Sequence, residues 1–300
     1  MAGISNIDRS IIFLCIIVSS WALSSVIYVD YFAEKEETIT DKTIFTYFTA
    51  DIVDNPELRP VDTFVRRPIQ TVPNYAIHPD MIMVGSGFKV SQNVWFTARH
   101  VVDGCKKVFV NEDYDNEQDI GTLLNQVYIH PASDLAAFVY DNIAPSFTVP
   151  TLDDDESKKT LLRTTAYTAG YPVGIPGNLY VKYLGKAALH NKNFDLLEPV
   201  FVWTVSKKFP EDLTTVGGIS GSPMFNAESR LVGVTIAEMV RRGTVSVADL
   251  HSINWFVKAV EDLSAPSPQK VAEQFTPEKM TELSNGLRNN KSIVQLVCET

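Results

Sequence analysis

The chain has 300 residues, of which 45% are hydrophobic and 21% are charged, and its formal net charge is −10. This length and apolar content exclude a disordered chain and suffice for one large core or two smaller cores packed together. The negative charge, with no basic stripe to neutralise phosphates, excludes a general nucleic-acid binder. The three cysteines, Cys15, Cys105 and Cys298, do not make a disulfide framework and do not indicate a compartment.

An uncharged apolar run covers residues 11–29, after an N-terminal segment of residues 1–10. As a helix with about 1.5 Å per residue, this run spans roughly 28 Å, close to the hydrocarbon core of a bilayer. We therefore expect a transmembrane anchor at 11–29, with the membrane as a partner. The weak bias of flanking charges favours a cytoplasmic N-terminus and an extracytoplasmic catalytic domain. The alternatives are a cleaved signal peptide with secretion, because the residues at 22–24 make an acceptable cleavage site, and a buried globular helix.

Residues 30–61 are acidic and mixed, so we expect a stalk there. From Met81 onward, short β-branched and apolar runs alternate with polar turns. The runs at 81–90 and 94–102 flank one such turn and predict a hairpin, with His100 at the end of its second strand. Short strands at this spacing are typical of a barrel or sandwich, so residues 62–150 are interpreted as a first β lobe.

A charge-rich run at 151–159 separates this lobe from a second region of the same character, and we interpret it as an inter-lobe linker. Residues 160–263 then form a second β lobe. Apolar residues at helical spacing in 252–260 predict a helix that closes this lobe. Prolines at 266 and 268 end the pattern, and we expect 264–300 to be a C-terminal tail with one short helix at about 277–287.

Small residues crowd around one hydroxyl in the run 214–225, which contains Gly217, Gly218, Ser220, Gly221 and Ser222. Glycine permits turns that place several amide N–H groups on one side, where they can bind an oxyanion. Taken alone, the run fits a nucleophile loop and a Gly/Ser-rich hairpin about equally well. A serine attacks only when a base removes its proton, so the choice depends on a histidine and an orienting acid elsewhere.

Of the five histidines, His100 is the one that packing at the end of a buried strand would position. The sequence around it, at 85–88 and 96–102, resembles the stretch around the general base of trypsin-like serine proteases. The run 133–138 resembles the family's segment with the orienting aspartate, here Asp134. The run 218–223 resembles its nucleophile loop, with Ser220 at the nucleophile position and Ser222 as a less favoured candidate. The three matches occur in the family's order and cover roughly residues 62–262.

This resemblance to chymotrypsin-fold proteases implies an all-β fold of two antiparallel six-stranded β-barrels with the active site between them. It implies that Ser220 attacks the scissile carbonyl, His100 transfers the proton and Asp134 orients the histidine. The backbone N–H groups of Gly218 and Ser220 would form the oxyanion hole. It implies no cofactor and no metal.

Two positions depart from the digestive members and are closer to bacterial and viral members that need no zymogen activation. Ile219 replaces the aspartate that pairs with a new N-terminus. Thr214 replaces an acid at the base of the specificity pocket, whose wall we assign to Thr235, Ile236 and Ala237. We therefore expect a neutral, small-to-medium side chain before the scissile bond.

The sequence thus predicts a membrane-anchored serine endopeptidase that acts on a protein or peptide substrate. The alternative is a catalytically silent peptide-binding module with the protease fold, against which the complete set of His100, Asp134 and Ser220 argues.

Overall fold

The computed structural model describes residues 42–48, 69–72, 81–114, 121–150 and 165–300, which belong to one compact unit, Lys42–Thr300. The predicted anchor at 11–29, most of the predicted stalk and the predicted linker at 151–159 lie outside these ranges. Among the described residues, no helix is long and apolar enough to cross a membrane.

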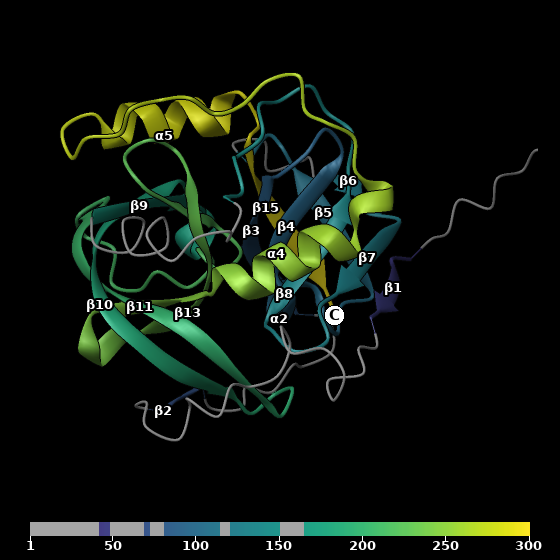
Figure 1. Ribbon diagram of the computed structural model, residues 1–300, viewed down its shortest axis with the longest axis horizontal. Helices are drawn as coiled ribbons and strands as arrows, with labels where there is room; N and C mark the ends of the chain where they lie inside the picture. Colours follow the sequence, from purple (N-terminus) through teal and green to yellow (C-terminus); the bar gives the residue numbers. More distant parts are fainter. Residues whose placement is uncertain (1–41, 49–68, 73–80, 115–120, 151–164) are drawn as a thin grey trace, which may run out of the picture. The chain divides into compact units, whose positions relative to one another are not determined.

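The first lobe is an eight-stranded sheet with the order β1-β7-β8-β4-β3-β15-β5-β6 (Figure 1). Strand β1 is parallel to β7, and the other neighbours are antiparallel. The strands are β1 (Ile44–Tyr47), β3 (Ile82–Lys89), β4 (Val94–Ala98), β5 (Lys107–Asn111), β6 (Thr122–Leu123), β7 (Gln126–Ile129), β8 (Leu135–Val139) and β15 (Ile293–Glu299).

The expectation of a closed, six-stranded first barrel is wrong in two respects. Two strands that we did not assign to this lobe, β1 and β15, join its sheet. Within the described residues no pairing joins the edge strands β1 and β6, and β6 is only two residues long, so the lobe is a half-barrel.

The second lobe confirms the other predicted barrel. Its six antiparallel strands close because β11 pairs with both β14 and β10. A further strand, β2 (Ile69–Val72), adds in parallel to the outer edge of β10. The barrel strands are β9 (Thr165–Gly170), β10 (Gly177–Asn191), β11 (Leu196–Phe209), β12 (Pro223–Phe225), β13 (Leu231–Met239) and β14 (Thr244–Ala248).

Strand β4 shows why the lobes pack so closely. All five of its residues are buried, as expected for an apolar run with neighbours on both faces. The Phe96 ring stacks on Phe256 with 5.3 Å between centroids, and Trp95 stacks on Phe138 at 5.9 Å. Each such side chain contributes about 1.5–3 kcal/mol when fully buried. The predicted closing helix is present as α4 (Leu250–Ala259), capped by Asp249, and its Phe256 is the residue that reaches β4.

The C-terminal segment is not a tail beyond the lobes. The predicted short helix is present as α5 (Met280–Asn289), yellow in Figure 1, and β15 follows it. Strand β15 pairs with β3 on one side and β5 on the other, so it lies inside the first-lobe sheet. A disulfide bond between Cys298 on this strand and Cys105 also corrects our view that the cysteines form no structural bridge.

Candidate active site

The predicted catalytic residues come from three elements at the boundary of the two lobes. His100 lies in the one-turn helix α2 (Arg99–Val102), directly after β4, and Asp134 directly precedes β8. Because β4 pairs with β8, the two residues are neighbours. Ser220 lies in the loop before β12. His100 and Ser220 both line a cavity of about 160 Å³.

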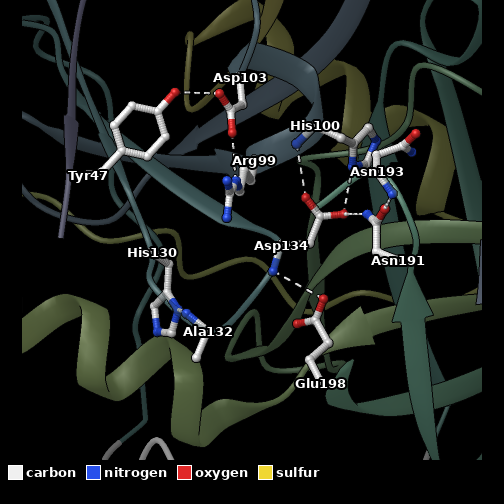
Figure 2. Close-up of polar contacts among 10 residues, drawn as sticks. All are labelled: Tyr47, Arg99, His100, Asp103, His130, Ala132, Asp134, Asn191, Asn193 and Glu198. Carbon is white, nitrogen blue, oxygen red and sulfur yellow. Dashed lines mark hydrogen bonds and ion pairs between the residues drawn. The ribbon is translucent and has the colours of Figure 1, made fainter. Parts of the chain in front are cut away.

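His100 is held by Asp134 through two contacts (Figure 2). Its Nδ1 lies 2.8 Å from Oδ2 of the carboxylate, and its backbone N–H donates to Oδ1 at 2.9 Å. Burial alone lowers the pKa of His100, but the charge and hydrogen bond of Asp134 outweigh burial and hold the pKa above its ordinary value. The pairing leaves Nε2 as the ring nitrogen available to other groups. Within the described residues, no hydrogen bond joins His100 to Ser220.

Two residues that sequence reasoning missed, Asn191 and Glu198, support Asp134 from the second lobe (Figure 2). Asn191 donates from Nδ2 to Oδ2 of Asp134 at 3.3 Å. Glu198 is fully buried and accepts hydrogen bonds from the backbone N–H of Asp134, at 3.1 Å, and from the Ser133 hydroxyl. Burial and then the Asp134 charge raise the pKa of Glu198 well above its ordinary value. A lone acid in the apolar run 196–203 was the available signal for Glu198.

His130 is a fully buried histidine near this region, and its environment differs from that of the partly exposed His100. Its Nδ1 accepts the backbone N–H of Ala132 at 3.0 Å, and its ring packs edge-on against Trp255. Burial, helped by the Arg99 charge, lowers the pKa of His130 to about 3. His130 is therefore a neutral core residue.

The loop around Ser220 is turned so that its carbonyl groups face β3. The backbone N–H of Ser86 donates to the Ser220 carbonyl at 2.9 Å, and the Ser86 hydroxyl donates to the Gly218 carbonyl at 3.0 Å. Gly218 has a φ of +92°, and a Cβ there would lie 2.7 Å from the Tyr171 carbonyl oxygen. The N–H groups of Gly218 and Ser220 donate to no group in the part of the chain that the structure describes. They remain available to an outside acceptor.

The two candidate nucleophiles occupy different environments. Ser220 is partly exposed and lines the cavity, whereas Ser222 is fully buried and does not line it. Ile219, between Gly218 and Ser220, is 2% exposed and belongs to the hydrophobic core. No charged group of this loop is thus positioned to pair with a chain terminus.

Three of the four predicted specificity residues, Thr235, Ile236 and Ala237, line the cavity together with His100 and Ser220. The fourth, Thr214, is exposed and does not line it, whereas the nearby Val216 and Gly217 do. The cavity also contains Glu238, which sequence reasoning did not assign. In the described ranges, no group of three or more His, Cys, Asp or Glu side chains is arranged to hold a metal ion.

Comparison with known proteins found both relatives and similar folds. The glutamyl endopeptidase of Staphylococcus epidermidis is 28% identical over 167 residues, which are 51% of this chain and 53% of that protein. The chain therefore spans about half the length of the curated relatives it matches. Among solved structures, the active form of the Rv3671c protease of M. tuberculosis has a TM-score of 0.40 and 14% identity, covering 78% of this chain and 94% of that chain. The NS6 protease of murine norovirus 1 has a TM-score of 0.37 and 19% identity, covering 55% and 85%.

A family model described as "Trypsin-like peptidase domain" matches residues 85–234, which are 150 of the 300 residues. The matched region begins in β3, includes His100, Asp134 and Ser220, and ends in β13. The chain therefore belongs to the trypsin-like peptidase family.

Proposed function

We propose that the chain is a serine endopeptidase that hydrolyses peptide bonds through Ser220, His100 and Asp134. The observation that carries the proposal is the cavity lined by Ser220 and by the one histidine in the described residues that a buried carboxylate orients. A nucleophile, a base and an orienting acid are the groups that acyl transfer to a serine requires.

In the proposed mechanism, Ser220 Oγ attacks the scissile carbonyl while Nε2 of His100 takes its proton. Asp134 stays ionised, keeps the other proton on Nδ1 and stabilises the cation that forms. The raised pKa of His100 fits this role, because it reflects a site that favours the protonated ring. His100 then gives the proton to the leaving amine. In the second step, His100 takes a proton from the water that attacks the acyl-enzyme, and it returns a proton to Ser220 as the acyl group leaves.

The available N–H groups of Gly218 and Ser220 would bind the oxyanion of the tetrahedral intermediate. Each such donor is worth on the order of 3 kcal/mol in the transition state. The carbonyl groups of Gly217 and Ile219 accept backbone hydrogen bonds from Val173 and Ser222. These bonds support the proposal, because a carbonyl lies trans to the N–H of the next residue, here Gly218 and Ser220.

Glu198 would support Asp134 as a neutral acid. Its raised pKa favours the neutral carboxyl, which avoids a second negative charge next to Asp134. A neutral Glu198 can still accept the Asp134 N–H and share a hydrogen bond with the Ser133 hydroxyl.

We also propose that residues 11–29 anchor the enzyme in a membrane with the catalytic domain on the extracytoplasmic side. The disulfide bond between Cys105 and Cys298 supports this side, because such bonds persist in oxidising compartments. Carbonate washing of membranes tests the anchor: the full-length chain should resist extraction and a chain without residues 11–29 should not. Release of a shortened product whose N-terminus lies near residue 25, when the full-length chain is expressed, would favour the signal peptide.

Labelling with a fluorophosphonate tests the nucleophile, because this reagent reacts with activated serines. We expect the wild-type protein and Ser222→Ala to be labelled and Ser220→Ala to remain unlabelled. Labelling that survives Ser220→Ala but is lost in Ser222→Ala would assign the nucleophile to Ser222. A folded wild-type protein that takes no label would instead favour the peptide-binding module without catalysis.

A further inference from the structure

The cavity beside Ser220 and His100 contains an acid that the proposed mechanism does not use. Glu238 lies near the end of β13, three residues after Thr235 and on the same wall. The register of β13 against β14 shifts between Thr235 and Ala237, so Ile236 is an extra residue in the strand. A bulge of this kind changes the direction of the side chains that follow it and is common beside active sites.

The Glu238 carboxylate contacts the loop segment that precedes Ser220. Its Oε2 accepts the Thr215 hydroxyl at 2.8 Å and the backbone N–H of Val216 at 3.0 Å. The Thr215 oxygen in turn accepts the N–H of Gly217, which directly precedes the oxyanion-hole glycine Gly218. The carboxylate therefore links the strand wall to the segment that leads into the nucleophile loop.

Both donors to Glu238 are neutral, so the hydrogen bonds leave its negative charge in place. One carboxylate oxygen, Oε1, accepts no hydrogen bond from the described part of the chain. Among the described residues that line the cavity, only Glu238 and His100 have ionisable side chains, and His100 is already paired with Asp134. The structure thus places, in the space next to the nucleophile, an acid that has no cationic partner among the described residues.

We propose that Glu238 makes this cavity select a lysine or arginine side chain before the scissile bond. The inference rests on the proposed function and replaces our expectation of a neutral side chain there. A basic side chain would supply the missing counter-charge and donate to Oε1, whereas an acidic side chain would meet a like charge in a partly desolvated space. A neutral side chain would leave the carboxylate as it is.

A series of peptides that differ only in the residue before the cleaved bond tests the proposal. For the wild-type protein, we expect kcat/KM for Lys or Arg to exceed that for Ala, Leu or Glu by at least about tenfold, the effect of one hydrogen bond to a charged group. In Glu238→Gln, the amide oxygen can still accept from Thr215 and Val216, but the charge is gone. We expect this variant to lose most of the basic preference, so that the ratio of kcat/KM for Lys to that for Ala or Leu falls toward one.

Two control variants separate the charge of Glu238 from its hydrogen bonds to Thr215 and Val216, which are called the wall link here. Glu211→Gln removes an equal charge from an exposed position outside the cavity, and it should leave the preference unchanged. Thr215→Val is isosteric and removes one donor to Glu238 while the charge remains, so it should keep the preference for Lys and Arg. A basic preference that is lost in Thr215→Val but survives in Glu238→Gln would show that the wall link, not the charge, matters.

The outcomes distinguish this inference from the proposed function. Hydrolysis without a preference for Lys or Arg, or an unchanged basic preference in Glu238→Gln, would overturn the inference and leave the peptidase intact. Binding of fluorescent peptides that end in Lys, Ala or Glu to Ser220→Ala, followed by anisotropy, needs no catalysis. If the wild type hydrolyses no peptide, the proposed function fails. The inference still stands in that case if the Lys peptide binds most tightly and loses this advantage in the Ser220→Ala, Glu238→Gln double variant.

Discussion

Replacement of Glu198 tests how this residue of the second lobe positions Asp134 of the first lobe. Glu198 is buried on β11 and accepts the Asp134 N–H at 3.1 Å and the Ser133 hydroxyl. In Glu198→Ala both donors lose their partner in a dry environment, at about 1–3 kcal/mol each. We therefore expect the free energy of unfolding to fall by about 2–5 kcal/mol. We also expect kcat/KM to fall about a hundredfold, because a small displacement of Asp134 misaligns His100.

Glu198→Gln is the matched variant, because it keeps the shape and both hydrogen bonds if the Ser133 hydroxyl becomes an acceptor. The variant differs from the wild type because the amide side chain of glutamine does not titrate. The folded-state pKa of Glu198 is raised above its ordinary value of 4.5, so the folded protein binds this proton more tightly than the unfolded chain. The unfolded chain then holds fewer protons between the two pKa values, and the free energy of unfolding falls as pH rises through this window.

Thermal unfolding of the two proteins from below pH 4.5 to neutral pH measures this difference. The contribution of Glu198 to stability is complete below its unfolded pKa and is lost as pH rises through its folded pKa. We expect the wild type to lose stability relative to Glu198→Gln over that range, by about 1.4 kcal/mol for each unit between the two pKa values. Other titrating groups are common to both proteins and cancel. A wild type that instead gains stability relative to Glu198→Gln with rising pH would show that Glu198 works as an ionised acid, and would refute the reasoning.

Three further substitutions and one control variant test separate parts of the structure. Asp134→Asn should reduce kcat about 10⁴-fold, and it should lower the pKa of His100, shifting the acidic limb of the kcat/KM profile to lower pH; an unshifted limb would contradict the pairing. Gly218→Ala places a Cβ 2.7 Å from a backbone oxygen at a φ of +92° and should abolish peptide hydrolysis. The control Gly286→Ala, in open space on α5, should instead raise the free energy of unfolding by about 0.5–1 kcal/mol. Cys105→Ser removes the disulfide and should lower the free energy of unfolding by about 2–5 kcal/mol, as denaturant titration would show; an unchanged midpoint would mean that β15 needs no covalent tie.

The features that could be predicted from the sequence are local ones. The strand that leads to His100 is a continuous apolar run, and the loop around Ser220 needs glycine at Gly218 and Gly221 because both have positive φ. The apolar spacing of 252–260 likewise indicated α4 directly. Each of these depends on a few neighbouring residues, so its physical cause lies within a short window of sequence.

The features that were missed depend on contacts between distant parts of the chain. Strand β15 pairs with β3 across about 200 residues, and neither run carries a signal for its partner. Glu198 supports Asp134 only because β11 of the second lobe packs against the start of β8. Glu238 enters the cavity after a strand bulge whose position no short pattern reveals, and Thr214 was assigned to the cavity without knowledge of that geometry.

Hydrolysis of a quenched-fluorescent peptide library, with the new N-termini identified by mass spectrometry, tests the central claim most directly. We predict that the purified wild-type protein produces such termini and that Ser220→Ala, with an unchanged unfolding midpoint, produces them at least about 10⁴-fold more slowly. Equal hydrolysis by Ser220→Ala, or no hydrolysis by the folded wild type, would contradict the assignment of Ser220, His100 and Asp134 as the catalytic groups of a peptidase.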